Sequence, residues 1–351
     1  MRWLLIAALV ALIATPLFGD VFYTRLATRI LIFGLIAIGL NLIVGYTGLV
    51  SFGHAAFVGL GAYTVAILRF HGIESGLVAL PAAIGVAALG ALVIGAVALR
   101  TSGVYFIMIT LAFAQMLFFF FHDNLGFGGS DGFYLNNKPK VEIGAITLVD
   151  LRNRTEFYYF TLFWLAFTYL FVAMILRAPF GRVIAAIRVN EPRARALGFP
   201  TQRYKLASFV IAGMLAGLAG YLTCAQFGVI NPAYLSWRES GQALVIVILG
   251  GIGTLYGPVL GAFVLVLLED FVSSLTDHWL LAIGGFVIAV VLFLPDGIAS
   301  LIDGRLWRRK APAAEQDVET EAEIAALAAG SPDSVAAQSP ERGVGGVRDH
   351  S

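Results

Sequence analysis

The chain has 351 residues, of which 59% are hydrophobic and only 13% charged, with a formal net charge of +1. This composition indicates an integral membrane protein, and no nucleic-acid partner is expected. Apolar runs of about 17 or more residues recur along the chain, and each is long enough to cross the roughly 30 Å hydrocarbon core as an α-helix. Residues 78–99 and similar runs show no alternating polarity, which argues against membrane β-strands.

In chain order, the apolar runs predict ten membrane spans. They lie at 3–18, 26–46, 50–69, 77–99, 103–121, 157–176, 205–224, 239–256, 258–276 and 279–302. The turns near Thr47 and Gly257 are short enough to be re-entrant breaks instead of hairpins. We therefore expect an all-α, polytopic helical bundle of about 8 to 10 transmembrane helices, with Gly-rich broken or tightly turned segments.

The first run has two interpretations, a retained span or a cleaved signal peptide. Arg2 and a short apolar core are typical of a signal peptide. No small-x-small cleavage pattern ends the run, however, and the distribution of positive charge is consistent with retention. The retained span is the favoured interpretation.

Positive charge predicts the orientation. Residues 177–205 hold seven basic residues and a single acid, Glu191. The positive-inside rule places this loop in the cytoplasm, and counting spans outward from it puts both termini there as well. Arg25 and Arg29 run against this scheme.

Two Gly-rich stretches interrupt the apolar pattern. The first is GYTGLVSFGHAAFVGLGAY, residues 45–63, in which Gly45 and Gly48 fit a turn and Ser51 fits a helix cap. The second lies in VIVILGGIGTLYGPVLGAFV, residues 245–264. Broken helices in a bilayer are tolerated only where protein or water satisfies the freed backbone groups, so the pair favours a transport pathway over ordinary tight hairpins. The predicted pathway residues are Asn41, Gly45, Thr47, Gly48, Ser51, His54, Gly250, Gly253 and Tyr256.

Two loops and a tail complete the plan. The loop 122–156 is predicted to be external, and its segment GGSDG (128–132) suits turns or a protein contact through Ser130 and Asp131. The loop 177–205 is predicted to form two short helices, because Asn190, Glu191 and Pro192 interrupt one apolar face. Residues 1–302 then form a permease domain, and residues 303–351, rich in acids, Ala and Ser, form a disordered cytoplasmic tail.

No catalytic chemistry is visible. The four lysines lie outside any G-x-x-x-x-G-K-[ST] motif, so the chain is not expected to bind ATP through a P-loop. Five scattered histidines and one cysteine predict no metal site and no cofactor bound by this chain. A transporter subunit is favoured over a membrane enzyme.

Four motifs in order resemble the branched-chain amino acid permeases of bacterial ABC importers, the M-type subunit above all. They are GYTGLVSFGHAAFVGLGAY, GGSDG, AAIRVNEPRARALG at 185–198, and VILGGIGTLYGPVLGA at 247–262. The resemblance covers roughly residues 26–301. It implies a multi-pass subunit of the bacterial cytoplasmic (inner) membrane that translocates Leu, Ile or Val.

The resemblance also implies partners: a homologous H-type permease, two cytoplasmic ATPase subunits that use ATP, and a soluble substrate-binding protein, which Ser130 and Asp131 would contact. ABC importers generally carry Glu-Ala-Ala with a glycine six residues after the Glu in the loop that meets the ATPase. Here Pro192 follows Glu191 and Gly198 lies seven residues on, so the match is loose. The coupling residues implied by the family are Arg188, Glu191, Arg193, Ala194, Arg195 and Gly198.

Three alternatives stay open. The first is a permease of the same family for urea, short amides or other amino acids. The second is an ion-coupled secondary carrier, which usually has a charged residue at membrane depth; the sequence shows none clearly. The third is a membrane enzyme.

Overall fold

The structure, a computed structural model, describes Pro16 and residues 21–73, 75–135, 140–143, 146–294 and 296–302. The chain divides into two units, residues 1–304 and 305–351, and every described residue belongs to the first. The predicted span 3–18, apart from Pro16, and the predicted tail 303–351 lie outside the described residues.

Helices make up most of the described chain. The elements are α2 (Val21–Asn41), η2 (Leu42–Thr47), α3 (His54–Phe70), α4 (Gly76–Ala98), α5 (Val104–Asp123), η3 (Leu125–Phe127), β1 (Phe133–Tyr134), β2 (Lys140–Ile143), β3 (Ile146–Asp150), α6 (Arg154–Arg177), α7 (Pro179–Val189), α8 (Glu191–Ala196), α9 (Thr201–Phe227), β4 (Val229–Ile230), η4 (Pro232–Leu235), α10 (Trp237–Gly250), α11 (Gly257–Leu275), α12 (Trp279–Phe293) and α13 (Ala299–Ile302). The all-α prediction is confirmed.

Six described helices are long and apolar enough to cross a membrane: α2 with η2, α4, α5, α6, α9 and α11. The apolar helices α3 and α12 are shorter. Together with α10, these nine helices match the nine predicted spans that fall within the described residues. Five span limits were predicted wrongly by four residues or more, and two of them are the starts of α2 at Val21 and of α9 at Thr201. The third span begins at His54 because residues 48–53 are non-helical, the eighth ends at Gly250, and the last stops at Phe293 before the short α13.

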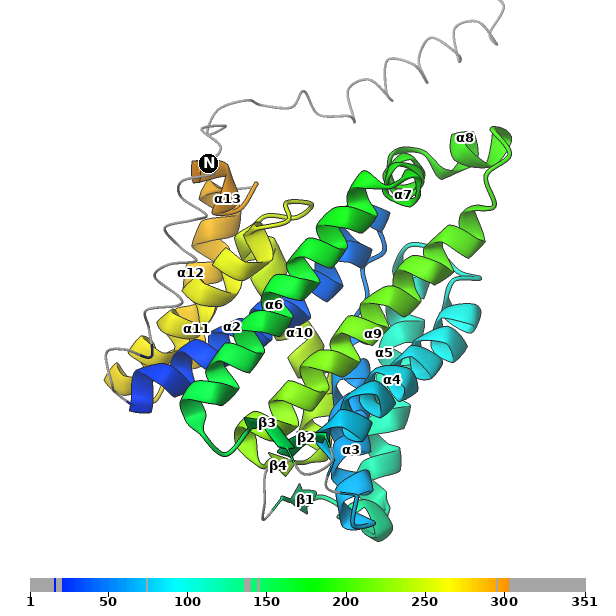
Figure 1. The fold of residues 1–351 in the computed structure, drawn as a ribbon. Helices are drawn as coiled ribbons and strands as arrows, with labels where there is room; N and C mark the ends of the chain where they lie inside the picture. Colours follow the sequence, from blue (N-terminus) through cyan, green and yellow to red (C-terminus); the bar gives the residue numbers. More distant parts are fainter. Residues whose placement is uncertain are drawn as a thin grey trace, which may run out of the picture. The chain divides into compact units, whose positions relative to one another are not determined.

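The helices run between two ends of the bundle (Figure 1). We call the end with α7, α8 and α13 the α8 end, and the end with β1, β4 and η4 the strand end. At the strand end β1 pairs antiparallel with β4, with Phe133 opposite Ile230, and β2 pairs with β3. The pairing of β1 with β4 ties the predicted external loop to the connection between α9 and α10.

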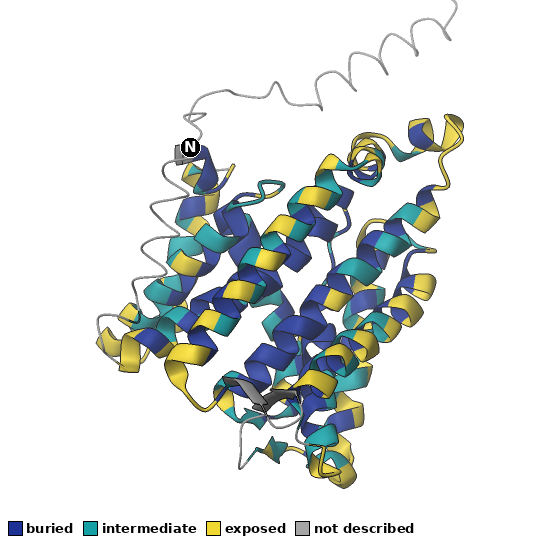
Figure 2. Ribbon diagram, viewed as in Figure 1, coloured by how far each residue is buried: buried dark blue, intermediate teal, exposed yellow. Residues whose placement is uncertain are grey.

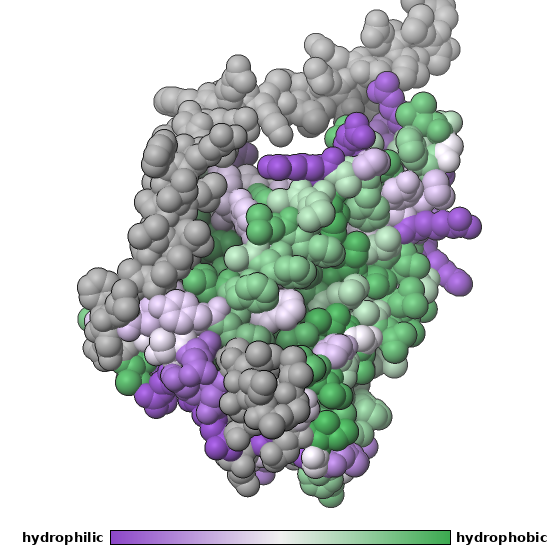
Figure 3. All heavy atoms as spheres, viewed as in Figure 1, coloured by the Kyte–Doolittle hydropathy of each residue, from purple (hydrophilic) through white to green (hydrophobic). Residues whose placement is uncertain are grey.

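Burial separates inner from outer helices. Most of α2 and α9 is buried, whereas α4, α5 and α12 turn many apolar side chains outward (Figure 2). Leu89, Met108 and Leu281 are 63%, 60% and 78% exposed. On the face in Figure 3, hydrophobic side chains cover the middle and hydrophilic ones gather toward the ends. This distribution fits a helical bundle surrounded by lipid.

Small residues allow α9 to pack closely on its neighbours. Buried alanines recur every fourth residue along α4, at 79, 83, 87 and 91, and face the glycines of α9. A Cβ atom on Gly217 would lie 2.7 Å from the Ala83 carbonyl oxygen, and one on Gly61 of α3 would lie 2.7 Å from the Gly217 Cα. Lipid tails contact apolar side chains as well as other helices do, so burial of apolar side chains adds little to helix association in a membrane. Close packing of backbones, which small residues allow, stabilises helix pairs there instead.

Replacing Gly217 by Ala is expected to destabilise the protein by about 1–3 kcal/mol, because the added methyl must push backbone apart. Gly85 of α4 has no atom within 4 Å of an added Cβ. Gly85→Ala is therefore the control and should be neutral or stabilising by up to about 1 kcal/mol. Thermal unfolding in detergent measures both, and equal midpoints for the two variants would contradict the packing argument.

Candidate functional site: the junction of two helix breaks and a polar cavity

The first predicted break follows α2. The helix widens into the π-helix η2, ends at Gly48, and leaves residues 48–53 non-helical before α3. Side chains from other helices satisfy amides near this segment: the Phe52 amide donates to Thr110 Oγ1 (3.3 Å) and the Ala55 amide to Ser240 Oγ (3.0 Å). Non-helical backbone at this depth needs such partners, because lipid offers none.

Two predicted pathway residues stabilise the same segment. The Thr47 hydroxyl donates to the Leu42 carbonyl oxygen (3.0 Å) and shares a hydrogen bond with Ser208 of α9 (2.7 Å). Ser51, expected to cap α3, instead accepts from the Gly53 amide (3.2 Å), one residue before the helix. Both side chains are buried, so they hold the break in place.

His54 is the first residue of α3 and is fully buried. Neither ring nitrogen makes a hydrogen bond of standard geometry with a described residue, although the Ile36 backbone is a polar neighbour. The ring packs edge-on against Phe57, with centroids 6.3 Å apart. The position is that of a packed core residue, and His54 does not line the cavity described below.

The second break closes a hairpin between α10 and α11. Gly251 and Gly253 have positive φ angles of 115° and 80°, and the Thr254 hydroxyl donates to the Gly251 carbonyl oxygen (2.8 Å). A Cβ on Gly250 would lie 3.0 Å from the Pro258 nitrogen, so the hairpin is tight. The Tyr256 hydroxyl donates to the Ala299 carbonyl oxygen (3.4 Å) and links the hairpin to α13.

The two breaks touch. Asn41, at the end of α2, accepts from the Gly253 amide (3.0 Å) and donates to the Thr254 carbonyl oxygen (2.8 Å). A Cβ on Gly45 would lie 2.7 Å from the Gly253 nitrogen, so the two backbones pass at close range. Segments more than 200 residues apart thus share one junction, which we call the break junction: Asn41, Gly45, Gly48, Gly253 and Thr254.

Arg188 connects the break junction to the α8 end. It lies on α7, and its Nη1 donates to the Gly45 carbonyl oxygen. A Cβ on Gly48 would lie 3.1 Å from Arg188 Cγ, and one on Gly253 would lie 2.9 Å from Arg188 Nη1. The structure therefore brings one predicted coupling residue into direct contact with three predicted pathway residues.

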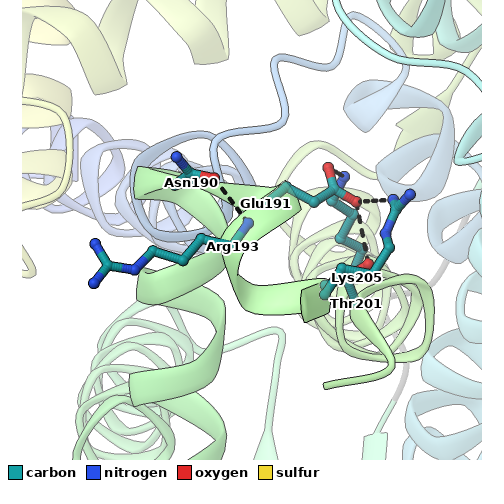
Figure 4. Close-up of polar contacts among 6 residues, drawn as sticks. Asn190, Glu191, Arg193, Thr201 and Lys205 are labelled. Carbon is teal, nitrogen blue, oxygen red and sulfur yellow. Dashed lines mark hydrogen bonds and ion pairs between the residues drawn. The ribbon is translucent and has the colours of Figure 1, made fainter. Parts of the chain in front are cut away.

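The predicted loop 177–205 contains the two short helices that were expected, α7 and α8. Figure 4 shows the polar contacts of Asn190 and Glu191, which begin α8. Asn190 caps α8 by accepting from the Arg193 amide (2.9 Å). Glu191 Oε1 accepts from Arg195 (2.7 Å) and Thr201 (3.2 Å), and Oε2 accepts from Lys205 of α9. The carboxylate thus fastens α8 to the start of α9.

Two opposing effects act on the pKa of Glu191. Burial raises it, whereas the hydrogen bonds and charges of Lys205 and Arg195, with the Thr201 hydroxyl, lower it; the net shift is downward. A lowered pKa means that this network stabilises the folded state above the ordinary carboxyl pKa and is lost as the pH falls through the lowered value. Glu191 is therefore ionised throughout the physiological range.

The predicted coupling residues differ in how far their side chains are exposed. Ala194 is buried, while Arg193 and Gly198 are exposed. Two apolar side chains next to them, Val189 and Leu197, are 86% and 71% exposed. Residues 189–198, which we call the α8 segment, therefore present arginine and aliphatic side chains outward, and Glu191 holds the base of this segment in place.

Ser130 and Asp131 lie in the turn before β1, and both are exposed. The Ser130 hydroxyl donates to Asp131 Oδ1 (3.3 Å), and the Gly132 amide closes the turn on the Gly128 carbonyl oxygen (3.0 Å). The turn interpretation of GGSDG is confirmed. A contact with a binding protein stays a prediction.

Sequence reasoning missed a polar cavity of about 530 Å³ at the strand end, which we call the Arg29 cavity. Its polar lining includes Thr223, Tyr234 and six charged or amide residues, Arg29, Asn231, Arg238, Glu239, Gln242 and Glu269. Arg29 Nη2 pairs with Glu269 Oε2 (3.0 Å), Gln242 donates to the same oxygen (3.4 Å), and the guanidinium lies 5.6 Å from the Phe33 ring centroid. The sequence signal that was missed is Arg29, whose positive charge did not fit the orientation predicted by the positive-inside rule. Its charge is paired with Glu269 inside the bundle, which explains the conflict.

Within the described residues, no group of three or more His, Cys, Asp or Glu could hold a metal ion. None of the nine predicted pathway residues lines the Arg29 cavity. The break junction and the cavity are therefore separate sites, near the α8 end and the strand end respectively.

Known proteins similar to this chain are transport permeases. The sequence profile of a family described as "Branched-chain amino acid transport system / permease component" matches residues 22–294. The Escherichia coli K12 protein "High-affinity branched-chain amino acid transport system permease protein LivM" is 31% identical over 313 residues, covering 84% of this chain and 74% of its own. LivH of the same strain is 26% identical over 296 residues, covering 76% and 90%. "Xylose transport system permease protein XylH", also from K12, is 30% identical over 128 residues and covers about a third of each chain. No solved structure gives a significant match.

Gly253→Ala is expected to destabilise the protein more than Gly72→Ala. Both glycines have nearly the same positive φ, 80° and 81°, so both variants incur a backbone cost of about 1–2 kcal/mol. Only at Gly253 must Arg188 and the Gly45 carbonyl also move, since nothing lies within 4 Å of a Cβ on Gly72. Thermal unfolding in detergent compares them, and equal losses would show that the junction is loosely packed.

Proposed function

The chain belongs to the branched-chain amino acid transport system permease family, and from that premise we propose that it is the M-type permease subunit of an ABC importer. In this proposal it imports Leu, Ile or Val across the bacterial cytoplasmic membrane. It pairs with an H-type permease, is driven by two cytoplasmic ATPase subunits, and receives substrate from a soluble binding protein. The α8 end faces the cytoplasm, as its positive charge favours.

The observation that carries the proposed mechanism is the hydrogen bond from Arg188 to the Gly45 carbonyl oxygen. The α8 segment protrudes with exposed Val189, Arg193 and Leu197, which suits docking to an ATPase subunit. A displacement of α7 and α8 would reach the break junction directly through Arg188. ATP use by the partner subunits would thereby change the packing of α2 against the hairpin of α10 and α11.

The choice of substrate rests on the relatives with broad coverage. LivM and LivH are named for branched-chain amino acid transport and align with at least three quarters of this chain. XylH, named for xylose, aligns with a third. A permease for urea, short amides or other amino acids is the second candidate within the family.

The structure contains charged residues of the kind that an ion-coupled carrier would use. The sequence showed no clear charge at membrane depth, but Arg29 and Glu269 form an ion pair between α2 and α11, and Glu239 is only partly exposed. Charge alone therefore no longer separates the two classes. Membership of the permease family and the separate α8 segment favour the importer.

Radiolabelled leucine uptake by cells that lack their own system is expected to require this chain, the H-type permease, both ATPase subunits and the binding protein together. Depletion of ATP should abolish uptake, and a protonophore should spare it while ATP is maintained. Full uptake with this chain alone, or loss of uptake with the proton gradient only, would contradict the proposal.

Arg188→Gln is expected to leave the complex assembled but to lower leucine transported per ATP hydrolysed. A charged hydrogen bond contributes about 1.5–3 kcal/mol, which corresponds to roughly a 10- to 150-fold change in an equilibrium between two conformations. Arg182, exposed on the same helix and without a contact to the junction, provides the control. Arg182→Gln should couple normally, so equal coupling ratios in the two variants in proteoliposomes would remove Arg188 from the mechanism.

A further inference from the structure

The polar lining of the Arg29 cavity carries both signs of charge. Two arginines, Arg29 and Arg238, and two glutamates, Glu239 and Glu269, line it, and these formal charges cancel. A cavity of this kind favours a ligand that has separated charges but no net charge, because a ligand with a single charge would be repelled by the lining residues of the same sign. A free amino acid at neutral pH is such a ligand.

Two acceptor groups in the lining, Glu239 and Asn231 Oδ1, lack a donor from the described residues. The Glu239 carboxylate makes no hydrogen bond or ion pair with another described residue, although Arg29, Arg238 and Glu269 lie within electrostatic range. The Asn231 Oδ1 atom is buried and has no hydrogen-bond partner among the residues described. A buried acceptor without a donor, such as Asn231 Oδ1, is costly, and the partly exposed Glu239 carboxylate has no donor within the described part of the chain either, so both are suited to a donor that arrives with a ligand. An ammonium group brings three donors.

Donor groups lie near them. Arg29 uses Nη2 for Glu269, and a guanidinium has five N–H donors, so most of its donors are free of that contact. Arg29 and Arg238 can therefore bind a carboxylate without breaking the pair with Glu269. Glu269 holds the guanidinium in position, and Gln242 donates to the same Glu269 oxygen.

Much of the remaining lining is apolar, although Thr223 and Tyr234 also belong to it. Ile32, Phe33 and Ile36 follow Arg29 along one face of α2, at helical spacing, and Val58 and Phe227 are among the other apolar residues of the wall. About 530 Å³ is ample for a six-carbon amino acid. A branched aliphatic side chain would replace water against these groups.

We propose that the Arg29 cavity binds the transported amino acid as a zwitterion, with its ammonium at Glu239 and Asn231, its carboxylate at Arg29 and Arg238, and its side chain against α2. This assignment rests on the proposed function. It places the substrate at the strand end, which faces the outside in that proposal, before the substrate reaches the break junction.

The test uses the complete importer in proteoliposomes and the photoactivatable diazirine analogue of leucine. Leucine uptake by the unmodified complex is measured first, so that a failure of the proposed function is recognised before the cavity is examined. Illumination is then expected to label peptides containing Ile32–Ile36, Val58 or Phe227, and excess leucine should prevent labelling. Label confined to peptides outside the cavity would overturn the assignment.

Glu239→Gln removes the charge proposed to bind the ammonium. The concentration of the analogue needed for half-maximal cavity labelling should rise by roughly 10- to 150-fold, the loss expected for a charged hydrogen bond. Asp270→Asn is the matched control, an acid next to Glu269 on α11 that does not line the cavity, and should label normally. Recovery of the assembled complex by gel filtration identifies any variant that fails to fold. Equal labelling of Glu239→Gln and the unmodified complex would overturn the proposal.

A phosphatidylethanolamine headgroup has the same pairing of ammonium with an anionic group. Vesicles of phosphatidylglycerol alone, compared with vesicles containing phosphatidylethanolamine, separate the two sources. Cavity labelling that persists without phosphatidylethanolamine supports the amino acid. A lipid retained by the purified complex, lost in Glu239→Gln and not displaced by leucine, would show that the cavity is a lipid site instead.

Discussion

Backbone polar groups that leave a helix inside a bilayer must find partners within the protein, and the rest of this structure depends on how that demand is met. At the first break the partners of the Phe52 amide and of the Ala55 amide in the first turn of α3 are side chains of α5 and α10. At the second break Asn41 serves both as acceptor and as donor. The breaks are therefore built into the packing of several helices, and neither can change its conformation without disturbing the other.

The same demand explains why Arg188 belongs to both functional groups. Its guanidinium satisfies the Gly45 carbonyl, which the π-helical end of α2 leaves available, while its backbone belongs to α7. One turn further on, Glu191 fixes α8 to α9 through Lys205. The cytoplasmic segment in our proposal thus has two anchors, one on the break junction and one on α9, and a force on α8 is divided between them.

Composition and periodicity were sufficient to predict the helical bundle, the positions of nine helices in the described part of the chain and the paired breaks, because long apolar runs and clustered glycines are local signals. They could not predict that Asn41 reaches Gly253, since that contact joins residues 212 apart and depends on how helices pack. The sequence did not predict the Arg29 cavity for the same reason. Arg29, Glu239 and Glu269 each look like a residue near a helix end, and only the fold brings them to one cavity.

The antiparallel pairing of β1 with β4 has a mechanical consequence. Phe133 lies two residues after Asp131, and its partner Ile230 immediately precedes Asn231 in the cavity wall. A short hydrogen-bonded ladder thus connects an exposed turn, which faces the outside in our proposal, to the lining of the Arg29 cavity. Any protein that grips the turn pulls on that wall as well, so docking and the opening of the chamber cannot be fully independent events.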